Sequence, residues 1–134
     1  MDTHARIEAF LSAGPWAVVG ATSVRSKYGN KVLRCYLQHE RAPVYPVNPR
    51  GGMIEGLQAY ASLSALPEPV RAISIITPPA ISEEIVLEAA RLGIRYLWMQ
   101  PGAESERALA LAAEHDLELI AGGPCILVVL GYRE

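Results

Sequence analysis

The sequence has little of what metal centres, disulfide-bonded domains and membrane spans are built from. Its two cysteines, Cys35 and Cys125, lie far apart and form no CxxC motif, so neither a metal site nor a disulfide framework is expected. The longest apolar run, 125–130, is far shorter than the roughly 20 residues that cross a bilayer. The first residues include Asp2 and Glu8 and do not show the basic-then-apolar pattern of a signal peptide. We therefore expect a cytoplasmic protein without a membrane partner.

The chain also lacks the broad positive charge of a nucleic-acid-binding protein. It has 134 residues, of which 51% are hydrophobic and 19% are charged, values typical of one globular domain spanning 1–134. Residues 1–54 carry seven Lys or Arg against three acids, whereas residues 55–134 carry five against eleven. Positive charge is therefore local, and we expect it to serve a small anionic ligand, not a nucleic acid.

Short apolar runs alternate with helical patterns along the whole chain. The runs lie at 16–19, 43–47, 71–76, 95–99 and 117–120, and the helical patterns at 28–39, 81–92 and 104–114, after a first helix capped by Thr3. Residues 53–70 are less regular, and the last apolar stretch reads as a strand or a short helix. This alternation predicts an α/β fold: a doubly wound, Rossmann-like parallel sheet of about five strands in the order 3-2-1-4-5.

The loop after the first strand contains cations where a helix should begin. From Gly20 to Arg34 there are four Lys or Arg and no acid. Arg25 and Lys27 near a helix N-terminus cost about 0.3–1 kcal/mol each, because the helix dipole is positive there. A bound phosphate reverses the sign of that effect. The helix over 81–92, with Glu83 and Glu84 expected in its first turn, shows the opposite pattern. The first loop therefore predicts a site for a phosphorylated ligand.

Two absences narrow the choice of ligand. The loop reads Gly20-Ala21-Thr22-Ser23-Val24-Arg25, which retains only the first glycine of the G-x-G-x-x-G dinucleotide motif. No acid follows the second strand to bind the ribose hydroxyls of NAD; Arg50 stands there instead. An arginine suits a ribose that carries a phosphate, so NADP and coenzyme A both stay open.

Several segments, in this order, resemble a known family. They are VVGATSVRSKYGNKV, VYPVNPRG, TPP after the third strand, LWMQPGAESE and the final cysteine-containing loop. The chain resembles the CoA-binding domain family, small Rossmann-like proteins similar to the N-terminal domain of the succinyl-CoA synthetase alpha subunit. The resemblance extends from about Gly14 to Leu130. It does not reach the second domain that carries the synthetase's phosphohistidine, so synthetase activity is not implied.

The resemblance implies coenzyme A as the cofactor and assigns residues to its parts. It implies phosphate contacts from Gly20, Thr22, Ser23, Arg25 and Lys27, and a ribose-phosphate and adenine region at Val47, Asn48, Pro49 and Arg50. It further implies that Thr77, Pro78 and Pro79 line the groove along the nucleotide and pantetheine arm, and that Gln100, Pro101 and Gly102 flank the route to the thiol.

No convincing catalytic constellation accompanies these residues. His4, His39 and His115 fall in helix or turn positions, and neither G-x-S-x-G nor H-E-x-x-H occurs. Cys125 follows a Gly-Gly-Pro turn at a strand end, where its thiol would face the ligand and form a mixed disulfide with coenzyme A; a buried, inert thiol is the alternative.

The leading function is therefore a non-catalytic CoA- or acyl-CoA-binding carrier, sensor or partner subunit. The alternatives are an NADP-dependent oxidoreductase or redox regulator on the same fold, and a phosphosugar- or nucleotide-binding subunit. A protein partner and a homo-oligomer both stay open.

Overall fold

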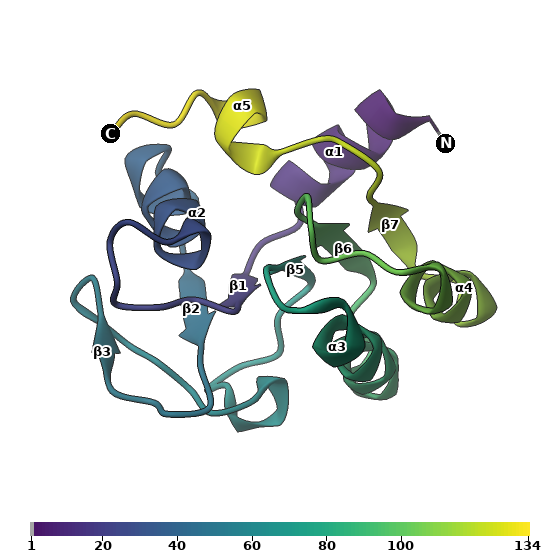
Figure 1. Cartoon of the computed structure of the whole chain (residues 1–134), viewed down its shortest axis with the longest axis horizontal. Helices are drawn as coiled ribbons and strands as arrows, with labels where there is room; N and C mark the ends of the chain where they lie inside the picture. Colours follow the sequence, from purple (N-terminus) through teal and green to yellow (C-terminus); the bar gives the residue numbers. More distant parts are fainter. Residues whose placement is uncertain (1) are drawn as a thin grey trace.

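A five-stranded parallel sheet with helices on both faces forms the centre of the computed structural model, which describes residues 2–134 (Figure 1). The strands of this sheet are β1 (Trp16–Val19), β2 (Val44–Val47), β5 (Ala72–Ile75), β6 (Tyr96–Met99) and β7 (Glu118–Ile120). The helices are α1 (Thr3–Leu11), α2 (Tyr28–Gln38), α3 (Pro79–Leu92), α4 (Glu106–Glu114), α5 (Ile126–Leu130) and the 3-10 turn η1 (Leu63–Ala65). The predicted α/β, Rossmann-like class is confirmed.

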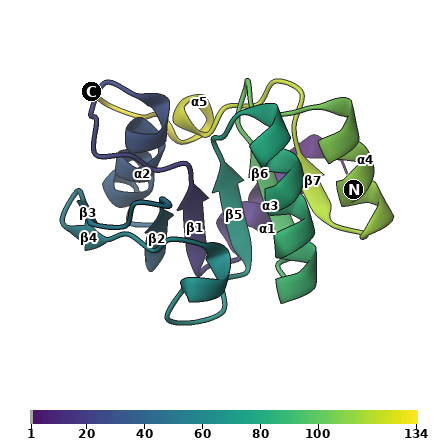
Figure 2. The ribbon, with the colours of Figure 1, turned by 60° about the horizontal axis from the view of Figure 1, so that its bottom comes forward.

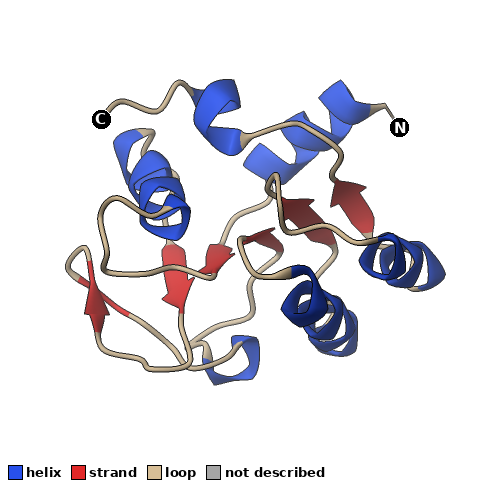
Figure 3. Cartoon of the chain, in the orientation of Figure 1, coloured by secondary structure: helices blue, strands red, loops and turns tan. Residues whose placement is uncertain are grey.

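The strands are mostly apolar because both faces of the sheet are covered (Figure 3). Val19 and Met99 belong to a core packed against α3 and α4. The alternate residues, such as Val18 and Trp98, belong to a second core beneath α1, α2 and α5. Side chains alternate between the two faces along each strand, so every strand residue has a helix to pack against.

The predicted strand order, 3-2-1-4-5, is wrong. The observed order is β2-β1-β5-β6-β7, which is 2-1-3-4-5 when the five strands are numbered along the chain. The prediction placed the third strand outside β2, but that edge is taken by the segment around Tyr60, which forms a parallel bridge to Val47. The chain then passes through η1 and enters the sheet at the free edge of β1, where β5 pairs with it in register.

The irregular segment before β5 contains a small hairpin that the sequence did not indicate. Its strands, β3 (Met53–Ile54) and β4 (Leu57–Gln58), pair antiparallel and form a separate two-stranded sheet. With only two residues in each strand, the hairpin is too short for a period-2 pattern to be read in the sequence. It nevertheless places Glu55 beside the first loop, as described below.

Two local expectations are corrected at helix ends. Asp2, not Thr3, caps α1, and its side chain accepts a hydrogen bond from the backbone N–H of Ala5 at 2.8 Å. Helix α3 begins at Pro79, so Glu83 and Glu84 lie beyond its first turn, and the contrast drawn with α2 is wrong. Proline at the first helical position starts the helix earlier because its fixed φ suits that position.

The last apolar stretch forms the short helix α5. Among residues 2–134, no helix has the length and hydrophobicity that crossing a membrane requires.

Candidate functional site

The carboxyl ends of β1 and β5 lie side by side at the point where the chain changes direction across the sheet (Figure 2). After β1 the chain enters α2 on one face, and after β5 it enters α3 on the other. Loops that leave in opposite directions create a crevice, the usual ligand site of this class of sheet. A cleft of about 520 Å³ lies there.

The cleft gathers five of the predicted residues from two loops. Those that line it are Gly20, Thr22, Lys27, Asn48 and Arg50. A second cavity of about 280 Å³ is lined by Thr77, Pro78, Pro101 and Gly102. Both cavities include Ile76, so they adjoin at the end of β5. The structure thus brings residues that are distant in the sequence to one edge of the sheet.

Two glycines allow the backbone to pack closely beneath this cleft. Gly20 has φ +98°, and a Cβ there would overlap the carbonyl oxygen of Ile76. A Cβ on Gly29 would in turn overlap the carbonyl oxygen of Gly20. Gly29 therefore allows the close helix–strand contact that the last glycine of the G-x-G-x-x-G motif provides. Sequence reasoning missed it because the loop here is longer than that motif.

Asn48 ties the two loops of the cleft together. Its Nδ2 donates to the carbonyl oxygen of Ala21 at 2.9 Å, and its Oδ1 accepts from the backbone N–H of Arg50 at 2.8 Å. The side chain is thus engaged within the protein at both ends. Its observed contacts are structural, and they hold the loop that carries Arg50 against the loop after β1.

Arg25 already has an acidic partner, contrary to the expectation that the first loop lacks one. Its Nε and Nη2 lie 3.3 and 3.4 Å from the carboxylate oxygens of Glu55, in the turn between β3 and β4. Asn30 donates to the same carboxylate at 3.1 Å. The hydrogen bond from Asn30, followed by the Arg25 guanidinium, lowers the pKa of Glu55 against the opposing effect of desolvation. A role for Arg25 in phosphate binding stays a prediction.

Lys27 keeps the cationic character that was expected of the first loop, and Arg50, in the loop after β2, shares it. Lys27 is the N-cap residue of α2 and makes no side-chain capping bond. Among residues 2–134, no ion pair involves Lys27 or Arg50. Two cations and the N-terminus of α2 therefore face one cleft with no acid paired to either cation, an arrangement that favours an anion.

The other predicted residues lie around the clefts without lining them. Ser23 and Pro49 are exposed in their loops, Val47 is buried in the core, and Pro79 is the first residue of α3. Gln100 is fully buried. None of these positions has been tested as a ligand contact, and each stays a prediction.

A polar cluster links the cleft to the loop after β7. The hydroxyl of Tyr28, which lines the cleft, lies 2.7 Å from Cys125 Sγ and donates to Gln100 Oε1 at 3.2 Å. Burial, and then the hydrogen bond with Cys125, raises the pKa of Tyr28, so its hydroxyl stays protonated at neutral pH. Tyr28 was absent from the predicted site. Its aromatic ring at the start of α2, directly after Lys27, is the sequence signal that could have pointed to it.

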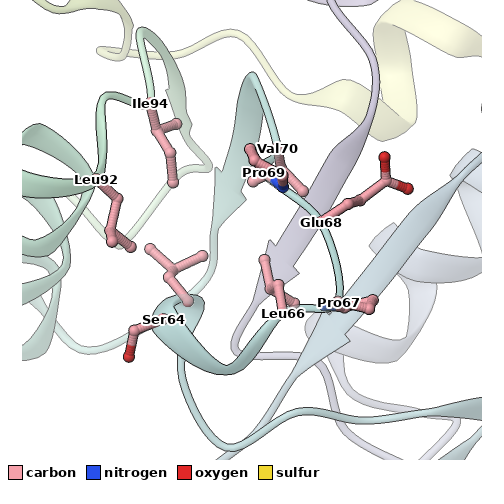
Figure 4. Close-up of a pocket in the computed structure, with 9 residues that line it drawn as sticks. Ser64, Leu66, Pro67, Glu68, Pro69, Val70, Leu92 and Ile94 are labelled. Carbon is pink, nitrogen blue, oxygen red and sulfur yellow. The ribbon is translucent and has the colours of Figure 1, made fainter.

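Two further cavities differ in character from this edge. One, of about 270 Å³, is lined mainly by apolar residues that precede β5 and β6, at the amino ends of the strands (Figure 4). Another, of about 250 Å³, lies beside the edge strand β2. Neither includes a lysine or an arginine.

Comparisons with known proteins agree with this geometry. A protein of Pyrococcus furiosus named acetate–CoA ligase [ADP-forming] II subunit alpha is 27% identical over 89 residues, which cover 66% of this chain and 20% of that protein. The chain spans about a fifth of the length of the curated relatives it matches.

Two solved structures match over most of their own length. A conserved hypothetical protein from Pyrococcus furiosus has 38% identity and a TM-score of 0.78, covering 85% of this chain and 97% of that one. A hypothetical protein from Pyrococcus horikoshii has 25% identity and a TM-score of 0.86, covering 96% and 89%.

The family described as "CoA binding domain" matches residues 15–131, which include every strand of the main sheet and every residue that lines the two cavities at its carboxyl edge. The chain therefore belongs to the CoA-binding domain family.

Proposed function

We propose that this protein binds coenzyme A or an acyl-CoA in the cleft between β1 and β5, and acts as a non-catalytic carrier, sensor or partner subunit. The observation that carries the proposal is that Lys27 and Arg50 both line a glycine-floored cleft and that, within residues 2–134, neither forms an ion pair with an acid. Such a cleft is electrostatically suited to a ligand with several phosphates.

The dimensions and lining of the two cavities fit a long nucleotide cofactor. The first cavity, of about 520 Å³, lies within the roughly 300–1,000 Å³ typical of ligand pockets. Lys27 and the free N–H groups at the start of α2 would hold phosphate oxygens there, and Arg50 a second phosphate. The adjoining cavity, walled by Pro78 and Pro101, would take an uncharged arm. Bound coenzyme A supplies a thiol that carries acyl groups as thioesters.

The histidines support a binding role over a catalytic one. His4 pairs with Glu8 at 3.0 Å on α1, and His39 contacts the carbonyl oxygen of Cys35 at 3.0 Å. His115 is the C-cap residue of α4. None of the three lines either cavity at the carboxyl edge. A general base for acyl transfer would have to lie within hydrogen-bond reach of the ligand there.

A ligand panel tests the proposal. Thermal unfolding is recorded with coenzyme A, 3′-dephospho-CoA, NADP, NAD and ATP, each at several concentrations. A ligand at a hundredfold its Kd stabilises the fold by about 2.7 kcal/mol, which raises the unfolding midpoint by at least about 5 °C for a chain of this size. We expect the largest shift with coenzyme A. A shift with NADP alone would favour the redox alternative and overturn the proposal.

A further inference from the structure

We propose that Cys125 is a site of covalent modification, at which the disulfide of coenzyme A exchanges to leave a mixed disulfide on the protein. This inference rests on the proposed function, because the disulfide must first be bound in the cleft. It adds a chemical reaction, thiol–disulfide exchange, that CoA binding alone does not require. The site is built from three elements, the loop after β7, the start of α2 and the end of β6.

The sulfur of Cys125 lies directly beside a residue that lines the cleft. Cys125 is partly exposed and directly precedes α5, which packs beside α2 (Figure 1). Its Sγ lies 2.7 Å from the hydroxyl of Tyr28, and the Tyr28 side chain lines the cleft. Cys35 offers the contrast within the same chain. It is fully buried in α2, and its thiol donates a weak hydrogen bond to the carbonyl oxygen of Ile126 at 3.8 Å.

Gln100 provides the second, independent sign of a ligand at this cluster. Its Oε1 accepts hydrogen bonds from the Tyr28 hydroxyl at 3.2 Å and from the backbone N–H of Ile126 at 2.9 Å. These two bonds fix the orientation of the amide. The amide nitrogen, Nε2, is fully buried and finds no acceptor among residues 2–134. Buried donors are nearly always paired, so we expect the acceptor of this one to be a water or a ligand.

The exchange balances without any further oxidant. The Cys125 thiol gives its proton to water, and the thiolate attacks one sulfur of the CoA disulfide. The S–S bond of the ligand breaks as the new S–S bond to Cys125 forms, and one CoA thiolate leaves and takes up a proton. The oxidation state of the sulfur pool is unchanged overall. The Tyr28 hydroxyl can turn its proton from Gln100 Oε1 to the Cys125 thiolate and donate to it before it attacks.

The test compares two disulfides and two cysteines. The intact protein is incubated with CoA disulfide or with glutathione disulfide at equal concentration, and adduct formation is followed by mass spectrometry with peptide mapping. Binding holds the reacting sulfurs together, so we expect CoA disulfide to react about tenfold faster or more. The adduct should map to Cys125, persist in Cys35→Ser, disappear in Cys125→Ser and be reversed by dithiothreitol. Tyr28→Phe should form it several-fold more slowly.

Each contrary result has a defined meaning. If coenzyme A raises the unfolding midpoint but no adduct forms on Cys125, the proposed function stands and this inference falls. An adduct on Cys35, or equal rates with both disulfides despite CoA binding, overturns it too. If coenzyme A neither shifts the midpoint nor competes with its own disulfide, the proposed function and this inference fail together. Circular dichroism of each variant shows whether the fold survived the substitution.

Discussion

Two cavities lie at opposite ends of the same sheet, and the residues that line them differ in charge and polarity. The cleft at the carboxyl edge has a volume of about 520 Å³ and is lined by glycine backbone, Lys27 and Arg50. The cavity at the amino ends, of about 270 Å³, is lined by leucines, prolines and Val70 (Figure 4). Its one charged residue, Glu68, accepts a hydrogen bond from the hydroxyl of Tyr45.

The difference follows from the direction of the strands. In a parallel βα fold the helix N-termini, with their free N–H groups, all lie near the carboxyl edge of the sheet. The helix C-termini and their carbonyl groups lie at the other edge. We therefore expect a phosphate to be stabilised at the carboxyl edge of the sheet and not at the amino edge. The backbone direction distinguishes the two ends, and so do Lys27 and Arg50, which form no ion pair within residues 2–134.

The largest expected effect is on stability, and it comes from adding a side chain at Gly20 beneath the cleft. Gly20→Ala places a Cβ against the carbonyl oxygen of Ile76 at φ +98°, so we expect a loss of about 3 kcal/mol or more in the free energy of unfolding. Gly52→Ala is the matched control. Gly52 also has positive φ (+82°), but a Cβ there would meet nothing within 4 Å, so we expect a loss of only about 1–2 kcal/mol.

Urea denaturation of both variants measures the difference. Equal losses would mean that the close approach of β1 and β5 is not needed for stability. The structural distinction between the two ends of the sheet would then rest on charge alone.

Reversing the charge at Lys27 tests whether the cations at the carboxyl edge are what make this end of the sheet bind phosphate. Lys27 is exposed, so its phosphate contact is worth about 1 kcal/mol, and a glutamate adds a repulsion of similar size; Lys27→Glu should therefore weaken coenzyme A binding roughly thirtyfold. Lys31→Glu, one turn further along α2, is the control, because Lys31 lies outside the cleft and its Nζ is 3.7 Å from Glu134. Isothermal titration gives both affinities.

A charge change at the amino-end cavity completes this test. Glu68→Gln should leave coenzyme A affinity unchanged, because Glu68 lies at the opposite edge of the sheet. If Lys27→Glu binds coenzyme A as well as the native protein does, the placement of phosphate at the start of α2 is wrong.

A smaller effect is expected from Arg50, and it separates the parts of the ligand. Arg50 is exposed, so its contact with a phosphate is worth about 1 kcal/mol, and Arg50→Ala should weaken coenzyme A binding roughly fivefold. If that phosphate is the one on the ribose, 3′-dephospho-CoA should bind the variant and the native protein equally. Equal losses for both ligands would place Arg50 on the diphosphate instead.

The sequence predicted the local elements of this fold well and the relations between distant elements less well. The apolar run at 16–19 matches β1 residue for residue, because a strand covered on both faces is uniformly apolar. The strand order was predicted wrongly because it depends on the segment around Tyr60 occupying the outer edge of β2. No local sequence pattern encodes that position.

The same distinction between local features and long-range contacts applies to the candidate site. Lys27 and Arg50 were found because a cation at a helix start or after a strand is a local anomaly. The pairing of Arg25 with Glu55 was missed, since it joins segments 30 residues apart in the sequence. Gly29 was missed because the sequence does not show that a Cβ at this position has no room. That restriction arises only when α2 packs onto the end of β1.

The smallest expected effect is the pH dependence that Glu55 contributes to stability. The pKa of Glu55 is lowered in the folded protein by Asn30 and Arg25, so its carboxylate stabilises the fold above the ordinary pKa of 4.5. That stabilisation is lost as the pH falls through the folded-state pKa. Glu55→Gln should therefore be slightly less stable than the native protein at pH 7, and urea denaturation at successively lower pH should show this difference shrinking.

The same variant shows whether the acidic hairpin restrains the cleft. Without the carboxylate, Arg25 is held less firmly by the β3–β4 turn and becomes available to a phosphate. If Arg25 belongs to the site, Glu55→Gln should bind coenzyme A a few-fold more tightly at pH 7, although it is less stable. Unchanged affinity would confine Arg25 to a structural pair and leave Lys27 and Arg50 to distinguish the two ends of the sheet.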